Sequence, residues 1–170
     1  MKNLLQTAEN AANIAGDIIL SYYHSEYEVK MKCKGNPVTE ADIAADQKLK
    51  EILTSAYPDY GWLSEETRDS PYRLEKERVW VVDPIDGTKE FVEGVPNFVV
   101  SIGLVENGIP ILGIIHNPVT KDTYSAFSGG GTKLNGKEVS ISIVSDLSKM
   151  EMLNSRSETQ KGLWDPYYSH

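Results

Sequence analysis

Two carboxylates follow an apolar run in the segment VWVVDPIDGTKEF, which extends from Val79 to Phe91. The apolar run has the β-rich composition of a buried strand, and Asp83 and Asp86 come at its end. Pro84 cannot donate a hydrogen bond to a neighbouring strand, so we expect it to end the strand and let the chain curl. The curl would bring both carboxylates and the Ile85 carbonyl around one point. Converging oxygens of this kind are the ligands that a hard cation such as Mg²⁺ prefers.

The next residues predict an anion site beside this cation site. Gly87 and Thr88 are expected to open a helical turn, whose free N–H groups attract phosphate oxygens. A phosphatase of the haloacid dehalogenase type is a different interpretation, but its aspartates lie two apart on one strand face, and here the spacing is three. A purely structural alternative also stays open, in which Asp86 caps the turn and Asp83 is an ordinary solvated carboxylate.

Two further acidic groups could complete a site. Glu65 and Glu66 follow a short expected strand, Gly61–Ser64, so one of them could point inward, although a solvated loop pair is the commoner arrangement. Asp42 lies in the first turn of an expected helix, where an acidic residue also stabilises the helix dipole. Asp46, one turn later, is expected to face solvent. The chemistry depends on whether the fold brings these groups together.

Hydrophobic periodicity predicts the elements that would do so. Apolar residues recur at helical spacing over Leu4–Tyr22, and a second helix is expected after Thr39, which reads as an N-cap. The residues of this second helix expected to face inward are Ala45, Leu49, Ile52, Leu53 and Ala56. Two segments, Lys30–Pro37 and Thr67–Lys76, are expected to be loops.

The rest of the pattern is typical of strands. The expected strands are Val79–Val82, Phe98–Val105, Ile109–His116 and Thr123–Phe127, and the pairs Asn107-Gly108 and Asn135-Gly136 predict hairpin turns. Helices followed by a mostly antiparallel sheet give an α+β fold class.

Composition limits the class of protein. The chain has 170 residues and a net charge of -8, which argues against a nucleic-acid polymer or an anionic membrane as partner. One cysteine, Cys33, excludes an internal disulfide and fits a reducing cytoplasm, and together with three histidines it offers no zinc spacing. No segment has the pattern of a signal peptide or the length of an apolar membrane span.

Four segments resemble the inositol monophosphatase superfamily in order and spacing: VTEAD, LSEE, WVVDPIDGTKEF and VSIGLVENGIPILGIIHNP. Members of this superfamily are Mg²⁺-dependent, lithium-sensitive phosphomonoesterases, and the similarity covers nearly the whole chain. The forms DGTKEF and LSEE are most similar to the 3'(2'),5'-bisphosphate nucleotidases, because true inositol monophosphatases usually have DGTTNF and GEE. The implied fold is the layered sugar-phosphatase type, with a helix pair packed on a large antiparallel sheet.

The resemblance implies a metal role for each matching residue. Glu65, Asp83 and the Ile85 carbonyl would hold one Mg²⁺, and Asp83 with Asp86 would help to hold a second. Asp42 would reach a third ion through water. Two or three ions are therefore implied, and Mn²⁺ is expected to substitute for Mg²⁺.

The resemblance also implies roles in catalysis and in phosphate binding. Thr88, with Glu65 or Asp42, would orient and deprotonate the attacking water, and the amides of Gly87 and Thr88 would hold the phosphate. Lys89 replaces a small polar residue of the monophosphatases and is a candidate for selecting a more highly charged substrate.

The implied activity is hydrolysis of the 3'-phosphate of 3',5'-bisphosphorylated nucleosides, such as adenosine 3',5'-bisphosphate, in the cytoplasm. An inositol or sugar-phosphate monophosphatase is the alternative enzyme, and an inactive module that binds a metal or a partner is the alternative of another class. The partner expected in either enzyme is a small phosphorylated substrate.

One feature of the superfamily is not matched. Its members continue beyond the point equivalent to His170 and supply a further aspartate in a Trp-Asp-x-Ala-Ala-Gly motif, to which Asp165 does not correspond. Residues 1–170 are thus expected to be an N-terminal α+β portion without a second domain, impaired in activity and prone to form homo-oligomers. The segment Leu153–Glu158 resembles the crossover strand of the family.

Overall fold

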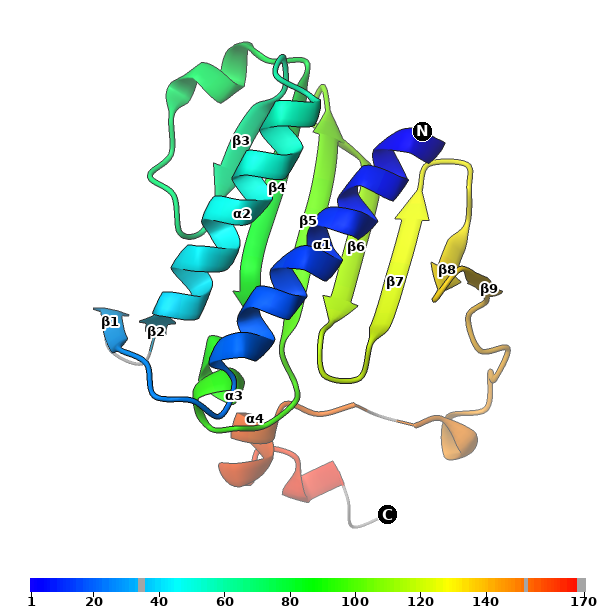
Figure 1. Cartoon of the computed structure of the whole chain (residues 1–170). Coiled ribbons are helices and arrows are strands. Elements are labelled where there is room, and N and C mark those ends of the chain that lie inside the picture. Colours follow the sequence, from blue (N-terminus) through cyan, green and yellow to red (C-terminus); the bar gives the residue numbers. More distant parts are fainter. Residues whose placement is uncertain (34–35, 152, 168–170) are drawn as a thin grey trace. The chain divides into compact units, whose positions relative to one another are not determined.

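The computed structural model describes residues 1–33, 36–151 and 153–167. These described residues form two compact units, one that ends at Val139 and one that begins at Ser140. The long helices and the strands belong to the first unit (Figure 1). In the described part of the chain, no helix is long and apolar enough to cross a membrane.

Two long helices, α1 (Lys2–Tyr22) and α2 (Glu40–Ala56), pack against each other and against the sheet. The expected N-cap of α2 is confirmed: Thr39 and Asp42 form a reciprocal capping box, in which each side chain bonds the other residue's backbone N–H. Ala56 is exposed, contrary to expectation, because Leu53 and Tyr57 form the core side of this end of the helix, with the Tyr57 ring packed near Trp80 of the sheet.

The main sheet has seven strands in the order of the chain, so each strand lies beside its sequence neighbour. The strands are β3 (Gly61–Ser64), β4 (Arg78–Asp86), β5 (Val99–Glu106), β6 (Ile109–Asn117), β7 (Asp122–Phe127), β8 (Thr132–Leu134) and β9 (Lys137–Val139). Only the β3–β4 pair within this sheet is parallel. The expected α+β class with a mostly antiparallel sheet is therefore confirmed.

The hairpin turns adopt the backbone conformation that their residues favour. Asn107 and Gly108 have φ angles of 49° and 83°, and Asn135 and Gly136 have 50° and 77°. Positive φ at both central positions suits the twist of the flanking strands, and asparagine and glycine adopt it most easily.

The core lies between the two helices and one face of the sheet (Figure 1). Every second residue of β4 and β5 points into it, as alternation along a strand requires. The sheet residues buried there include Trp80, Val82, Val100, Ile102, Leu104 and Ile114.

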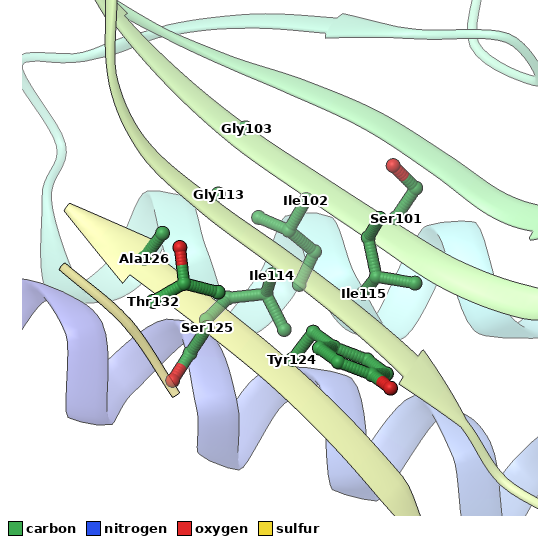
Figure 2. A pocket seen from close by; sticks show the side chains of 10 residues that line it. All are labelled: Ser101, Ile102, Gly103, Gly113, Ile114, Ile115, Tyr124, Ser125, Ala126 and Thr132. Carbon is green, nitrogen blue, oxygen red and sulfur yellow. The ribbon is translucent and has the colours of Figure 1, made fainter. Parts of the chain in front are cut away.

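On the opposite face of the sheet, the central positions carry small residues. Gly103 and Gly113 lie opposite each other on β5 and β6, and Ala126 lies opposite Gly113 on β7. Beside them, Ile115 and Tyr124 form a cross-strand pair with exposed fractions of 49% and 45% (Figure 2). A surface pocket of about 330 Å³ lies over this part of the sheet.

Three segments near the expected site differ from expectation. The segment Lys30–Pro37 was expected to be a loop, but β1 (Val29–Cys33) and β2 (Asn36–Thr39) form an antiparallel hairpin there, with residues 34–35 outside the described part. The segment Thr67–Lys76 contains a 3-10 helix, Pro71–Glu75. Strand β4 does not end at Pro84. It continues to Asp86, and its pairing with β5 skips from Asp83 to Asp86, so the missing proline N–H interrupts no ladder bond.

The second unit contains short helical turns: 3-10 turns at Leu147–Lys149 and Asp165–Tyr167, and helix α4 (Arg156–Gln160). The expected strand character of Leu153–Glu158 is wrong: residues 153–155 are not in a strand, and α4 begins at Arg156.

Candidate functional site

Asp42 and Thr88 connect helix α2 to the turn after β4. Thr88 Oγ1 lies 3.0 Å from Asp42 Oδ1 and 3.0 Å from the Ile85 carbonyl oxygen, so its single proton has two acceptors. Thr39 donates to the other carboxylate oxygen of Asp42 from its backbone N at 2.7 Å and from Oγ1 at 2.6 Å. Burial raises the pKa of Asp42, and the hydrogen bonds from Thr39 and Thr88 offset part of that rise. Asp42 is therefore held in place on both of its oxygens.

Within the described residues, no cation compensates the charge of Asp83. Its Oδ1 is buried and has no hydrogen-bond partner in the described part of the chain. Burial, followed by the charge of Glu65, a hydrogen bond with Glu65 and the charge of Asp86, raises the pKa of Asp83 to about 7. A carboxyl group that is driven to keep its proton by neighbouring carboxylates marks a place where a cation would be stabilised.

Lys32, on the β1–β2 hairpin, brings a positive charge to the glutamate pair and not to Asp83. Its Nζ lies 2.8 Å from Glu65 Oε1 and 2.5 Å from Glu66 Oε1. The Glu66 side chain is only 4% exposed, and burial raises the pKa of Glu66 despite this ion pair. The sequence predicted only a loop at Lys30–Pro37, and nothing in the local pattern indicated that Lys32 would contact two glutamates 33 and 34 residues away.

The turn between β4 and α3 (Thr88–Val92) requires a glycine. Gly87 has a φ of 102°, in the left-handed region, and an added Cβ would lie 2.7 Å from the Asn97 carbonyl oxygen. The expected helical turn after Gly87 is confirmed, since Phe91 N donates to Gly87 O at 3.0 Å. Because Gly87 has no side chain, its backbone lines the same cavity as the carboxylates.

The expected site residues other than Asp42 line one cavity of about 200 Å³. Its lining includes Glu65, Asp83, Ile85, Asp86, Gly87, Thr88 and Lys89. Asp42 lies behind Thr88, and the Lys89 ammonium lies 3.9 Å from Glu93 Oε1. The structure therefore brings together residues from the ends of β3 and β4 and the start of α2, as the sequence predicted.

Asp46 does not face solvent, and this expectation is wrong. It is only 5% exposed, and the hydroxyls of Ser64 and Thr67 donate to its two carboxylate oxygens. Helical periodicity places Asp46 on the same face as Asp42, which was the signal that could have identified it.

The chemistry of this set of donor groups fits a hard divalent cation. Within residues 1–33, 36–151 and 153–167, no three histidine, cysteine, aspartate or glutamate side chains already surround one point closely enough to coordinate an ion. The carboxylates instead bond Lys32 and one another. The orphaned Asp83 Oδ1 and the raised pKa of Asp83 are what a cation would relieve, and carboxylate and carbonyl oxygens are the ligands that Mg²⁺ accepts.

A family model described as the inositol monophosphatase family matches residues 1–165. Inositol monophosphatase 1 of Solanum lycopersicum is 35% identical over 151 residues, which cover 88% of this chain and 55% of that protein. The 3'(2'),5'-bisphosphate nucleotidase CysQ of Aggregatibacter actinomycetemcomitans is 38% identical over 131 residues, covering 76% of this chain and 49% of that protein. The chain thus spans about half the length of the curated relatives it matches.

Solved structures agree with the fold. The extragenic suppressor protein suhB from Bartonella henselae has a TM-score of 0.80 at 29% identity, over 84% of this chain and 55% of that chain. The IMPase TM1415 of Thermotoga maritima has a TM-score of 0.78 at 30% identity, over the same shares. The expected layered fold is confirmed for the matched half of these proteins.

Proposed function

The chain belongs to the inositol monophosphatase family, and on that premise we propose that it carries the metal- and phosphate-binding half of a Mg²⁺-dependent phosphomonoesterase. The observation that carries the proposal is the shared cavity, in which acidic side chains face the Gly87–Thr88 turn. Glu65, Asp83, Asp86 and the Ile85 carbonyl would hold the metal. The Gly87 and Thr88 amides would hold the phosphate.

Thr88 has the geometry to orient a water molecule. Its proton is directed to Asp42 Oδ1 or to the Ile85 carbonyl oxygen, so its lone pairs are left for a donor in the cavity. A water that donates to Thr88 Oγ1 would keep its own lone pairs for a phosphorus atom bound beside the Gly87 turn. The metal, when bound, would make that water more acidic and neutralise charge on the phosphate. Asp42 or Glu65 would then accept the proton.

For the substrate, we propose a 3',5'-bisphosphorylated nucleoside that loses its 3'-phosphate. The 38% identity to the CysQ nucleotidase and the DGTKEF segment support this choice. Lys89 lines the cavity, and its ammonium, which lies 3.9 Å from Glu93 Oε1, would exchange this long contact for a second phosphate group. Inositol or sugar phosphates are the second candidate, which the 35% identity to inositol monophosphatase 1 favours, and a histidinol-phosphatase is 34% identical.

The test compares phosphate release from adenosine 3',5'-bisphosphate, inositol 1-phosphate and histidinol phosphate in the presence of Mg²⁺. We expect the highest kcat/KM for the bisphosphate, and Lys89→Asn to lower that value more than the value for inositol 1-phosphate. A preference for inositol 1-phosphate would move the assignment to the second candidate.

A parallel titration with Mn²⁺ separates an enzyme from an inactive binding module. We expect binding that Asp83→Asn abolishes, because this substitution removes a central carboxylate. Binding of Mn²⁺ without turnover of any of the three substrates would indicate a metal-binding module. Absence of binding at millimolar Mn²⁺ would contradict the site itself.

A further inference from the structure

Asp46 joins helix α2 to both ends of the segment that carries the glutamate pair. The Ser64 hydroxyl donates to Asp46 Oδ1, and the Thr67 hydroxyl donates to Oδ2. Ser64 is the last residue of β3, and Glu65 and Glu66 lie between it and Thr67. The Asp46 carboxylate therefore connects the first and last residues of the four-residue segment Ser64–Thr67.

Backbone contacts within the loop depend on this arrangement. Ser64 Oγ accepts a hydrogen bond from Glu66 N at 3.3 Å, and it can do so because its own proton is given to Asp46. Glu65 N donates to the Val82 carbonyl at 3.3 Å, which ties the loop to β4. The direction of each glutamate side chain is therefore linked to the bonds that Asp46 accepts.

We propose that Asp46 is a positioning residue, which sets the orientation of the Glu65 and Glu66 carboxylates toward the metal; this inference rests on the proposed function. A buried carboxylate is unfavourable for stability unless hydrogen-bond donors compensate for the hydration that it loses. Asparagine has nearly the same shape and no charge, but only one acceptor oxygen. An aspartate at position 46 offers one oxygen to the Ser64 hydroxyl and the other to the Thr67 hydroxyl, which an asparagine cannot do.

The same helix holds the other side of the cavity. Asp42 accepts from Thr88 after β4. Asp46, one helical turn along α2, accepts from Ser64 at the end of β3 and from Thr67 after it. Strands β3 and β4 are parallel, with Ser64 opposite Val82, so their two C-terminal ends are adjacent. Helix α2 thus determines how the glutamate pair stands relative to the Thr88 hydroxyl.

The experiment is a calorimetric Mn²⁺ titration of the 170-residue chain and four variants. We expect Asp46→Asn and Thr67→Val to weaken Mn²⁺ binding about 10-fold to 100-fold, the effect typical of lost outer-sphere contacts. Thr67→Ser keeps the hydroxyl and should bind as the wild type does. Glu51→Gln is the matched control: it removes one negative charge from the same helix, at an exposed position paired with Lys48.

A second measurement separates the failure of this inference from the failure of the proposed function. Hydrogen exchange of the Glu65 and Glu66 amides is followed in the metal-free chain, and we expect faster exchange in Asp46→Asn but not in Glu51→Gln. Wild-type binding that Asp46→Asn leaves unchanged would overturn the positioning role alone. If the wild type binds no Mn²⁺, the proposed function fails, and unchanged exchange in Asp46→Asn would then also overturn the role of Asp46 in the loop. If Asp46→Asn does not fold, the comparison of Thr67→Val with Thr67→Ser tests the inference by the same two measurements, Mn²⁺ affinity and amide exchange.

Discussion

The hydroxyl oxygen of Thr88 lies 3.0 Å from a carboxylate oxygen of Asp42, although the two residues are 46 positions apart in the chain. Asp42 is fully buried, and Thr39 provides the donors for its other oxygen. The Thr88 hydroxyl is therefore a hydrogen-bond donor to the buried Asp42 carboxylate. This contact connects the start of α2 to the turn after β4.

Replacement of Thr88 by valine should destabilise the chain. Valine has the same shape but no hydroxyl, so Asp42 Oδ1 would lose this donor, and we expect the free energy of unfolding to fall by about 1–3 kcal/mol. Thr88→Ser retains the hydroxyl and should stay close to the wild type. Urea unfolding of both variants measures the difference, and equal midpoints for Thr88→Val and Thr88→Ser would contradict the assigned bond.

The pH dependence of stability should carry the signature of Asp83. Its pKa is about 7 in the folded chain and near 3.8 when unfolded, so between these values the folded state holds the extra proton. The contribution of this proton to the free energy of unfolding is present in full below pH 3.8 and is lost as the pH rises through about 7. Asp83→Asn should remove this loss, which thermal melts of the metal-free chain across that range would show.

Mn²⁺ should compete with the same proton. We expect the rise in Tm on addition of Mn²⁺ to be larger at about pH 8 than at about pH 5, because only the ionised carboxylate binds a cation well. An equal rise at both pH values, or an equal rise in Asp83→Asn, would show that Mn²⁺ binds elsewhere.

Lys32 should compete with a metal ion for the glutamate pair. Burial lowers its pKa, but hydrogen bonds to Glu65 and Glu66 outweigh this and leave the pKa of Lys32 raised, so the ammonium stays charged. Lys32→Met should therefore tighten Mn²⁺ binding about 5-fold, equivalent to ~1 kcal/mol for a partly exposed ion pair. Lys30→Met is the control, since Lys30 pairs with Glu28 on the exposed side of the hairpin. Weaker binding in Lys32→Met would instead mean that Lys32 supports the bound state.

The bare face of the sheet should promote self-association. Ile115 and Tyr124 stand exposed beside Gly103 and Gly113, and uncovered apolar surface of this kind is a common contact site between chains. We expect light scattering to rise with protein concentration, and Tyr124→Lys to reduce the rise. Ile109→Lys, at an exposed position near the β5–β6 turn, should have a smaller effect. A monodisperse monomer at all concentrations would refute this expectation.

Local signals in the sequence determined most of the fold. The capping box of Thr39 and Asp42, the hairpin turns at Asn107-Gly108 and Asn135-Gly136, and the glycine turn at Gly87 follow from preferences of one or two residues for particular φ values or donors. The apolar periods of α1 and of the central strands are local for the same reason. The acidic set at the ends of β3 and β4 could also be found, because its members lie directly beside these patterns.

Tertiary structure alone decided how the charges of the site are partnered. Lys32 meets Glu65 and Glu66 because a hairpin folds over the end of β3, and Asp46 is buried because α2 lies across the loop after that strand. Pro84 stays within β4 because β3 ends at Ser64 and the β4–β5 ladder skips the proline. Helical periodicity can place Asp46 on the inner face of α2, but local propensity does not identify the donors or charges that meet these side chains. A charged side chain is stable in the interior only if distant donors or opposite charges arrive there, and which segments arrive is a property of the packed chain.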